Sequence, residues 1–487
     1  MASAITRSRT PRPSIWKRAA TCCCTPCWSG PGLPELQQRY AEGKHYLHCG
    51  ELAAAEQCFL DVLEAQPLHA AARANLAYLK GQQGCHAEAE FHYRQALALA
   101  PEHVQLRQNF ATLLWQMKRL PEAEQLARAA LVEAPDDAAL LTLLGVILAC
   151  GQREAEAQQA YQLAIEADPH YARARFNLAY LLLRQGHLRE GWPLLAARWE
   201  FEALGAAFGC PQWQGVSLHG KSIILALEAG QGDMIQFSRY AALLKQRGAR
   251  TVALLCQPAL KRLFASLNGV DQVFAMNEPC DGGPWDYWSH PMHLPVWFDT
   301  TLDNVPAAIP YLASEAALVE YWQSRLPAAR LRVGLVWQGN PEFENDGERS
   351  LPSLHTLAPL AQVANVALIS LQHGVSRAGL GELAQQMQLT VLGDQLRDFA
   401  DTAAILSQCD LLISVDTAAA HLAGALGVPC WLLLPDYCCD WRWLTQRSDS
   451  PWYPSMRLFR QPAGGQTWRP VVEQLRDALM VLAQEVQ

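Results

Sequence analysis

Residues 67–101 read PLHAAARANLAYLKGQQGCHAEAEFHYRQALALAP, and this stretch sets the architecture of the N-terminal part of the chain. The proline that flanks it recurs at a constant spacing, at Pro67, Pro101, Pro135 and Pro169. Two further positions stay small at the same spacing, the first at Gly43, Ala77, Ala111, Gly145 and Ala179 and the second at Ala55, Ala89, Ala123, Ala157 and Gly191. Self-similarity at a fixed period indicates a repeat architecture.

A period of about 34 residues, with small residues inside the helices and a proline after the second helix, is the signature of tetratricopeptide repeats. The small residues mark where the two helices of a hairpin approach closely, and Phe59, Tyr93 and Tyr161 fill the space between neighbouring repeats. A single hairpin cannot bury its apolar face, so the units stack into a curved α-solenoid with a concave surface. We therefore expect five repeats over residues 35–203.

The composition of the 487-residue chain narrows the class of protein. Half of the residues are hydrophobic and 18% are charged, which is typical of a globular protein. The net charge of −8 argues against binding to nucleic acid or anionic membranes, because both favour a basic surface. No apolar run reaches the roughly 18 residues needed to cross a bilayer. Most of the 15 cysteines stand singly in apolar segments, so we expect reduced thiols in a cytoplasmic protein.

The N-terminal segment 1–34 contains no acidic residue, several Arg and Lys, and scattered Pro and Ser. A transit peptide has a similar composition, but we interpret this segment as a disordered tail or as the product of a start codon placed too far upstream. The tail holds Cys22, Cys23, Cys24 and Cys27. No second ligand pair at a defined spacing accompanies them, so the sequence predicts no metal site.

The fifth repeat departs from the pattern, because Gly191-Trp192 replaces the usual small–polar pair and no proline stands at position 203. A terminal repeat that changes character often packs against a following domain. Trp192, Trp199 and Phe201 would supply that interface. The alternative is that they only cap the solenoid.

Short apolar runs alternate with helical patterns after residue 211, as in βαβ units with parallel strands. These runs are residues 222–228, 251–256 and 270–275, followed by 331–337, 367–371, 389–392, 410–415 and 430–434. We expect two doubly wound, Rossmann-like parallel sheets, one in an N-terminal lobe over 204–328 and one in a C-terminal lobe over 329–487. Ligands of such sheets bind beyond the carboxyl ends of the strands, so the site is expected in the cleft between the lobes.

The segment Glu228-Ala-Gly-Gln-Gly-Asp233 follows the first of these strands. Gly230 and Gly232 permit positive φ and a close approach of the backbone to a ligand. The segment lacks the third glycine of a dinucleotide fingerprint, and an aspartate at the helix start would repel a phosphate. Asp233 is therefore either an ordinary N-cap or a general base whose ionised form the helix N-terminus favours.

The strand at 410–415 leads directly into Asp416-Thr417 and a helix of small residues. Thr417 can cap that helix, so that the free N–H groups of its first turn accept a diphosphate. His421, one turn further on, is placed to donate a hydrogen bond to the same phosphate. Alternatively, Asp416 and Thr417 are only caps and His421 is a core histidine. The run of alanines and Gly424, which let a ligand come near, favour the functional interpretation.

Two other segments carry polar or aromatic groups. The loop 338–352 follows the first strand of the second sheet, and Arg349 in it is able to pair with phosphate oxygens; a plain surface loop is the alternative. The stretches Asp440-Trp-Arg-Trp443 and 449–454 are rich in aromatic residues. Such density is typical of a sugar- or base-stacking surface or of domain packing, and we favour packing.

Together these segments resemble the bacterial tetratricopeptide-repeat glycosyltransferases whose catalytic half is related to the heptosyltransferases (glycosyltransferase family 9). The resemblance covers nearly the whole chain from Leu36 onward, and its most specific parts are 228–233, 416–427 and 440–454. The order of domains is also similar to that of protein O-GlcNAc transferases. The resemblance implies the two-lobed GT-B fold, a nucleotide-sugar donor bound mainly by the second lobe, no required metal and no further cofactor.

The resemblance also implies roles for individual residues. In heptosyltransferases the aspartate of the first Gly-rich loop is the proposed base, which corresponds to Asp233. Their Asp-Thr-Gly-x-x-His motif binds the donor diphosphate, and Asp416, Thr417 and His421 match it. Ala418 stands where that family has glycine, which puts the closest contact between backbone and phosphate in question.

The resemblance also assigns Gly230, Gly232 and Arg349 to the donor site. Arg349 is the counterpart of a basic residue that precedes a Trp-Pro step in heptosyltransferases. Asn75, Asn109 and Asn177 resemble the asparagine ladder with which O-GlcNAc transferase repeats hold a peptide backbone. Leu143 interrupts that ladder, and asparagine is frequent at this position in repeats of every kind.

The sequence thus predicts a cytoplasmic glycosyltransferase. Asp233 would deprotonate an acceptor hydroxyl, the helix after Thr417 would stabilise the leaving nucleoside diphosphate together with His421 and Arg349, and the repeats would present a protein or glycan acceptor. The alternative is a non-enzymatic protein, a repeat scaffold whose Rossmann pair has lost catalysis or only senses a nucleotide.

Overall fold

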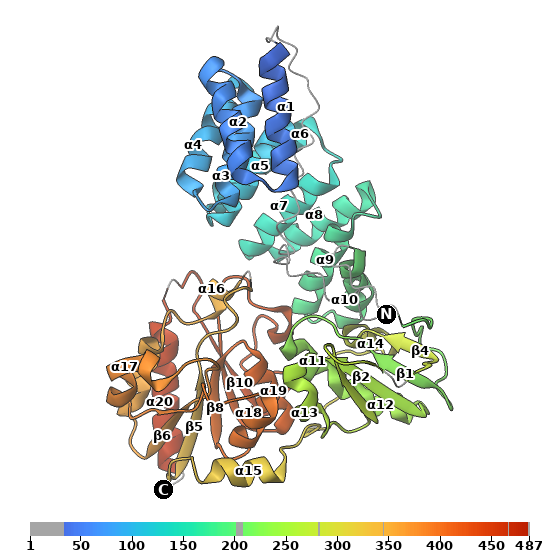
Figure 1. Cartoon of the computed structure of the whole chain (residues 1–487), viewed down its shortest axis with the longest axis vertical. Helices are drawn as coiled ribbons and strands as arrows, with labels where there is room; N and C mark the ends of the chain where they lie inside the picture. The colour runs from blue at the N-terminus through green and yellow to red at the C-terminus, as the bar shows by residue number, and fades with distance from the viewer. Residues whose placement is uncertain (1–33, 201–207, 281–282, 344, 466, 486–487) are drawn as a thin grey trace. The chain divides into compact units, whose positions relative to one another are not determined.

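The computed structural model describes residues 34–200, 208–280, 283–343, 345–465 and 467–485, and these form two compact units (Figure 1). One is a helical solenoid that extends from Pro34 to Leu181 and includes Glu200. The other is an α/β unit formed by Leu182–Trp199 and the described residues from 208 onward. The predicted fold class, a tetratricopeptide solenoid followed by an α/β part with two parallel sheets, is confirmed.

Helices of similar length follow one another in pairs through the solenoid. They are α1 (Pro34–Cys49), α2 (Leu52–Ala65), α3 (Ala70–Gln82), α4 (His86–Leu99), α5 (Val104–Gln116), α6 (Leu120–Glu133), α7 (Ala138–Cys150), α8 (Glu154–Ala167) and α9 (Ala172–Arg184). Each proline of the periodic series lies just beyond the second helix of a pair. Because proline cannot continue a helix, it ends every pair at the same place.

Small residues allow the two helices of a pair to touch, as predicted. A Cβ atom added to Gly43 would come within 2.8 Å of Cε1 of Phe59, and one added to Gly145 would come within 2.4 Å of Cε1 of Tyr161. These aromatic rings are fully buried and occupy the volume that a larger residue would need. Tyr93 also reaches the next repeat, where its ring stacks on Phe110 at 5.4 Å.

The second helix of the fifth repeat packs within the α/β unit. It is α10 (Leu188–Leu195), and the short helix η1 (Ala196–Glu200) follows it. The indole N–H of the buried Trp192 donates to the Thr300 carbonyl at 2.8 Å, and its ring meets Trp441 edge-on at 5.3 Å. Trp199 packs against His293 at 4.6 Å. Trp192 and Trp199 therefore form the expected contact with the α/β part, while Phe201 lies outside the described residues.

The sheet of the first lobe has the order β3-β2-β1-β4, with all strands parallel. Its elements are β1 (Ser222–Leu225), α11 (Gln231–Phe237), η2 (Ser238–Tyr240), α12 (Ala241–Gln246), β2 (Thr251–Cys256), η3 (Pro258–Leu260), α13 (Lys261–Phe264), β3 (Gln272–Ala275), β4 (Tyr287–Ser289), η4 (Pro291–His293) and α14 (Leu294–Trp297). Between β1 and β2 the chain forms three short helices in succession, α11, η2 and α12. The chain leaves β1 toward β2 and later returns on the other side with β4, so the winding direction changes between β1 and β4.

The sheet of the second lobe is also entirely parallel, in the order β10-β9-β8-β5-β6-β7. Its elements are α15 (Ala316–Gln323), β5 (Leu331–Val336), α16 (Asp346–Arg349), η5 (Leu354–Gln362), β6 (Val366–Ser370), α17 (Arg377–Gln386), β7 (Thr390–Val391), α18 (Phe399–Leu406), β8 (Leu411–Val415), α19 (Ala418–Leu426), β9 (Cys430–Leu434), η6 (Trp441–Trp443), β10 (Met456–Arg460) and α20 (Arg469–Glu485). Here the winding direction changes between β5 and β8. Every residue of β8 is buried, which accounts for a sequence that is apolar except at Ser414.

The strands β4 and β10 were not predicted. The first is very short, and the second lies at the edge of its sheet and carries Arg457 and Arg460 instead of forming an apolar run. Among the described residues, no helix combines the length and the hydropathy needed to cross a bilayer.

Two glycines of the solenoid allow a test of the close approach within a repeat. Replacing Gly145 by Ala forces Tyr161 to move, and we expect this overpacking to destabilise the fourth repeat by about 1–3 kcal/mol. Replacing Gly81 by Ala is the matched control, because its Cβ would meet Leu113 at an ordinary 3.7 Å and alanine favours the helix by up to about 1 kcal/mol. Hydrogen exchange of α7 and α8 measures the effect. Equal protection in the two variants would contradict the packing described.

Candidate functional site

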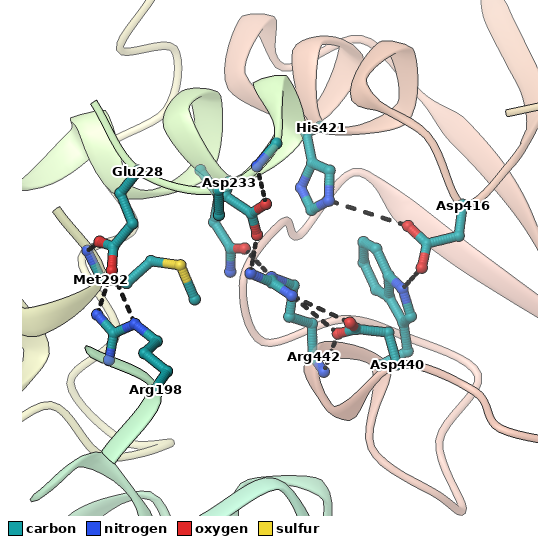
Figure 2. Close-up of polar contacts among 12 residues, drawn as sticks. Arg198, Glu228, Asp233, Met292, Asp416, His421, Asp440 and Arg442 are labelled. Atoms are coloured by element: carbon teal, nitrogen blue, oxygen red, sulfur yellow. Dashed lines mark hydrogen bonds and ion pairs between the residues drawn. The ribbon is translucent and has the colours of Figure 1, made fainter. Parts of the chain in front are cut away.

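Segments that follow three strands of the two sheets meet at one place in the α/β unit: those after β1, β8 and β9 contribute Asp233, Asp416 and Arg442 (Figure 2). The segment after β5 carries Arg349, whose charge acts on Asp416 and His421. Two pairs of strands, β1 with β4 and β5 with β8, mark the points where the winding of each sheet changes direction. Loops diverge at such points, and ligands of doubly wound sheets bind there.

Asp233 is the third residue of α11, which begins at Gln231 with Gly230 as its N-cap. Its Oδ2 accepts the backbone N–H of Gly230 at 2.8 Å, and its Oδ1 contacts Nη2 of Arg442 across the two lobes. The N-cap interpretation is therefore wrong, because the N-cap is Gly230, three positions earlier. The Asp233 carboxylate instead accepts a hydrogen bond from the backbone of that N-cap residue. The side chain keeps 23% of its surface exposed.

The ionisation of Asp233 is subject to opposing influences. Burial raises the pKa of this carboxyl, while the charge of Arg442 and the hydrogen bond from Gly230 lower it. The helix N-terminus was expected to favour the ionised form, but desolvation is the largest influence and the pKa of Asp233 is raised.

Gly230 and Gly232 do not have the positive φ that their pattern suggested. Gly230 has φ −82°, Gly232 lies inside α11, and the left-handed residue of the segment is Ala229 at φ 54°. Gly232 is needed for a different reason. A Cβ atom there would come within 2.8 Å of Cδ2 of His421 and 3.5 Å of Cα of Ala418, so its missing side chain lets α11 and α19 touch.

Arg442 occupies the centre of the site and connects both lobes. Its Nε donates to Oε1 of Gln236 at 2.5 Å, its Nη1 donates to both carboxylate oxygens of Asp440 at 3.0 and 3.1 Å, and its Nη2 contacts Asp233. The guanidinium lies 4.5 Å above the ring of Trp441 and is almost completely buried. The sequence marked this segment only as aromatic packing. That interpretation holds for Trp441, which is fully buried, but it missed the arginine.

Asp416 and Thr417 connect β8 to α19. Thr417 is the N-cap residue as predicted, but its side chain makes no capping hydrogen bond, and its Oγ1 lies 3.1 Å from Oγ of Ser414. Oδ2 of Asp416 accepts the indole N–H of Trp443 at 2.9 Å. Across the described parts of the chain, the backbone N–H groups of Ala418 and of the next residue have no hydrogen-bond partner. The first turn of α19 therefore has free N–H groups that are able to donate hydrogen bonds to an anion.

His421 is buried between the lobes. Its Nδ1 lies 3.0 Å from the Tyr453 hydroxyl, its Nε2 lies 3.9 Å from Oδ1 of Asp416, and its ring packs at 5.4 Å from that of Trp443. Burial, followed by the positive charge of Arg442, lowers the pKa of His421 well below 6.5. The imidazole is therefore neutral at physiological pH and carries a single N–H group.

Arg349 closes the short helix α16. Its Nε donates to Oδ1 of Asp346 at 3.1 Å, and its guanidinium lies 4.4 Å from the ring of Phe343. Its positive charge lowers the pKa of both Asp416 and His421, so it lies within electrostatic range of the α19 terminus.

Glu228, the first residue of the Gly-rich segment, serves the fold. Its carboxylate is completely buried, contacts the guanidinium of Arg198 in η1 and accepts the backbone N–H of Met292 at 3.0 Å (Figure 2). It thereby ties η1 to the first lobe. A buried, fully paired carboxylate of this kind is not available to a substrate.

The three asparagines of the solenoid are buried. Nδ2 of Asn75 donates to the Tyr40 hydroxyl at 3.0 Å, and Oδ1 of Asn109 accepts from Nε2 of Gln105 at 3.0 Å. Asn177 is 8% exposed. These side chains therefore offer little surface in the described state, and the peptide ladder stays a prediction.

Within the described residues, no group of three or more His, Cys, Asp and Glu side chains has an arrangement suited to a metal ion. The four tail cysteines, from Cys22 to Cys27, lie outside those residues.

Comparison with known proteins identifies the repeats. Models of the tetratricopeptide repeat match residues 40–104, 82–147 and 160–192. The chain is 25% identical over 333 residues to Protein FlbA of Caulobacter vibrioides, an alignment that covers 63% of this chain and 55% of that protein. This chain thus spans little more than half the length of that relative.

Solved structures resemble part of the chain. MamA 41-end from Desulfovibrio magneticus RS-1 is 17% identical with a TM-score of 0.32, and the likeness covers 35% of this chain and 97% of that one. The pilF protein of Pseudomonas aeruginosa is 22% identical with a TM-score of 0.32, and the likeness covers 36% of this chain and 78% of that one.

The site predicts an unusual pH dependence of stability. Burial, followed by the charge of Asp440, raises the pKa of Asp416 to about 6, whereas an unfolded aspartate titrates near 3.9. The folded protein therefore binds this proton more tightly, and the stability it contributes is lost as the pH rises through 6. The free energy of unfolding of the wild type, minus that of Asp416→Asn, should fall by roughly 1–1.5 kcal/mol between pH 5 and pH 8.

Urea unfolding followed by tryptophan fluorescence measures this difference. Asp449→Asn is the control, because Asp449 is 62% exposed and its pKa is lowered by Arg447, so no fall of that kind is expected. A difference that stays constant or rises with pH would show that Asp416 is not the buried acid described.

Proposed function

We propose that the protein is a glycosyltransferase that moves a sugar from a nucleotide-sugar donor to an acceptor hydroxyl. One observation carries the proposal: a partly exposed carboxylate of the first lobe, Asp233, stands beside the N-terminus of α19 in the second lobe. The residue next to it, Gly232, touches His421 and Ala418. This supports the proposal, because a carboxylate and a helix N-terminus with free N–H groups lie together near the ends of two parallel sheets, where such sheets bind ligands.

In the proposed reaction Asp233 is the general base. It takes the proton of the acceptor hydroxyl while the hydroxyl oxygen attacks the anomeric carbon of the donor. The bond between that carbon and the diphosphate oxygen breaks, and its electron pair leaves with the nucleoside diphosphate. Each Asp233 oxygen already accepts one hydrogen bond, from Gly230 or Arg442, and each keeps a second lone pair for the incoming proton.

The leaving group is where negative charge develops, so donors fixed in advance at that point supply most of the catalysis. The unpartnered N–H groups of Ala418 and its neighbour are such donors, and the helix dipole of α19 adds to them. Arg349 would contribute a positive charge. Its guanidinium would release the Asp346 carboxylate and bind the phosphate oxygens instead. This arrangement tolerates Ala418 in place of glycine, because its N–H group remains available.

The solenoid would present the acceptor. Tetratricopeptide repeats stack into extended surfaces suited to protein partners, so a protein acceptor fits this part of the chain best. A cytoplasmic location follows from the sequence argument and remains part of the proposal.

The proposal predicts that two substitutions around Arg442 have different effects. Asp233→Asn removes the base and should lower transfer by a factor on the order of 10²–10⁴, with donor binding nearly intact. Asp440→Asn also removes one carboxylate partner of Arg442 but leaves Asp233 in place, so its loss should stay within about tenfold. The measurements are thermal shifts with a panel of UDP-, GDP-, ADP-, dTDP- and CMP-sugars, and release of the matching nucleoside diphosphate or monophosphate.

Equal losses in the two variants would mean that Asp233 only anchors Arg442. If the wild type is stabilised by a sugar nucleotide but neither hydrolyses nor transfers it, the protein is a nucleotide-sensing scaffold instead.

A further inference from the structure

Tyr453 has no part in the function proposed above, yet it is the direct hydrogen-bond partner of His421. It belongs to the aromatic stretch between β9 and β10 and is fully buried. Its ring lies against α19, where a Cβ atom added to Gly424 would come within 2.3 Å of Cδ1 of Tyr453. This close contact fixes the ring and places the hydroxyl 3.0 Å from Nδ1 of His421.

The neutral imidazole of His421 has two tautomers, with the hydrogen on Nδ1 or on Nε2. The two nitrogens face different groups: Nδ1 faces the Tyr453 hydroxyl, and Nε2 faces Oδ1 of Asp416 at 3.9 Å. A phenol both donates and accepts, so Nδ1 alone does not settle the tautomer. Above pH 6 the Asp416 carboxylate only accepts. It repels a lone pair on Nε2 and attracts an N–H group there.

The environment of Tyr453 favours the same choice. Burial raises the pKa of its hydroxyl well above 10, so the hydroxyl keeps its proton and has one to donate. The guanidinium of Arg239 lies 4.7 Å above the Tyr453 ring. A positive charge there strengthens the phenol as a donor. Both sides of the imidazole therefore select the form in which Tyr453 donates to Nδ1 and the hydrogen resides on Nε2.

We propose that Tyr453 is a positioning residue that fixes His421 in the Nε2–H tautomer and holds that N–H group toward Asp416 and the N-terminus of α19. Resting on the function proposed above, the inference assigns His421 a donor hydrogen bond to the leaving diphosphate. The opposite tautomer would present a lone pair to the phosphate and would oppose the charge that develops there. The residue thus acts on the reaction only through the histidine.

The test compares Tyr453→Phe with Tyr240→Phe. The control tyrosine is also fully buried, but its hydroxyl is hydrogen-bonded to Oγ1 of Thr300 at 2.7 Å. Histidine-selective ¹⁵N NMR of the full chain at pH 7.5 reports the tautomer, and His421→Gln identifies the His421 signals. We expect the Nε2–H pattern in the wild type and in Tyr240→Phe, and a mixed or Nδ1–H pattern in Tyr453→Phe.

The second measurement is the rate of transfer with the most active sugar nucleotide of the panel. Loss of the partner that orients a metal-bound histidine typically costs about 10–100-fold in activity. We expect a loss of the same order for Tyr453→Phe and a loss of less than about threefold for Tyr240→Phe. An Nδ1–H tautomer in the wild type, or an unchanged pattern in Tyr453→Phe, overturns the inference. A wild type with the Nε2–H pattern that shifts in Tyr453→Phe, but with no transfer for any donor, refutes the glycosyltransferase proposal and leaves the positioning role intact.

Discussion

The buried guanidinium of Arg442 is the constraint on which the site depends. It is a cation with almost no exposure, and the interactions that compensate its desolvation include those with Gln236 and Asp233 on the first lobe and with Asp440 on the second. Removing one partner of a buried pair typically costs about 3–5 kcal/mol, because the remaining charge stays buried. Arg442 therefore links the two lobes, and through it Asp233 of the first lobe is tied to the segment after β9 in the second.

The site also depends on helices that pack closely against neighbouring side chains, and this explains why glycine occupies positions 232 and 424. Gly232 brings α11 against His421, and Gly424 brings α19 against Tyr453. A side chain at either position would move the helix that carries a polar group of the site. The same principle operates in the solenoid, where Gly43 and Gly145 admit an aromatic ring. These four glycines thus mark close contacts between elements of the fold.

Local patterns in the sequence predicted the elements well and the interactions between them poorly. The constant period of the repeats determined the helix pairs because each proline and each small residue has the same local role in every repeat. Buried strands such as β8 stood out as apolar runs, whereas β4 and β10 lack that pattern. The contact of Arg442 with Asp233 joins residues that are 209 positions apart, and no local signal relates them. Likewise, only the fold places Tyr453 beside His421, and the positive φ expected of Gly230 belongs to Ala229.

A double-mutant cycle tests most directly whether Asp233 and Arg442 interact across the two lobes. Asp233→Asn, Arg442→Gln and the combined variant would be compared with the wild type by urea unfolding at pH 8, followed by tryptophan fluorescence. Each substitution changes the free energy of unfolding. If the two side chains interact across the lobes as described, the sum of the two single changes will differ from the change in the combined variant by about 1.5–3 kcal/mol. Effects that add to within about 0.5 kcal/mol would show that the two side chains do not interact, and the site as described would not exist.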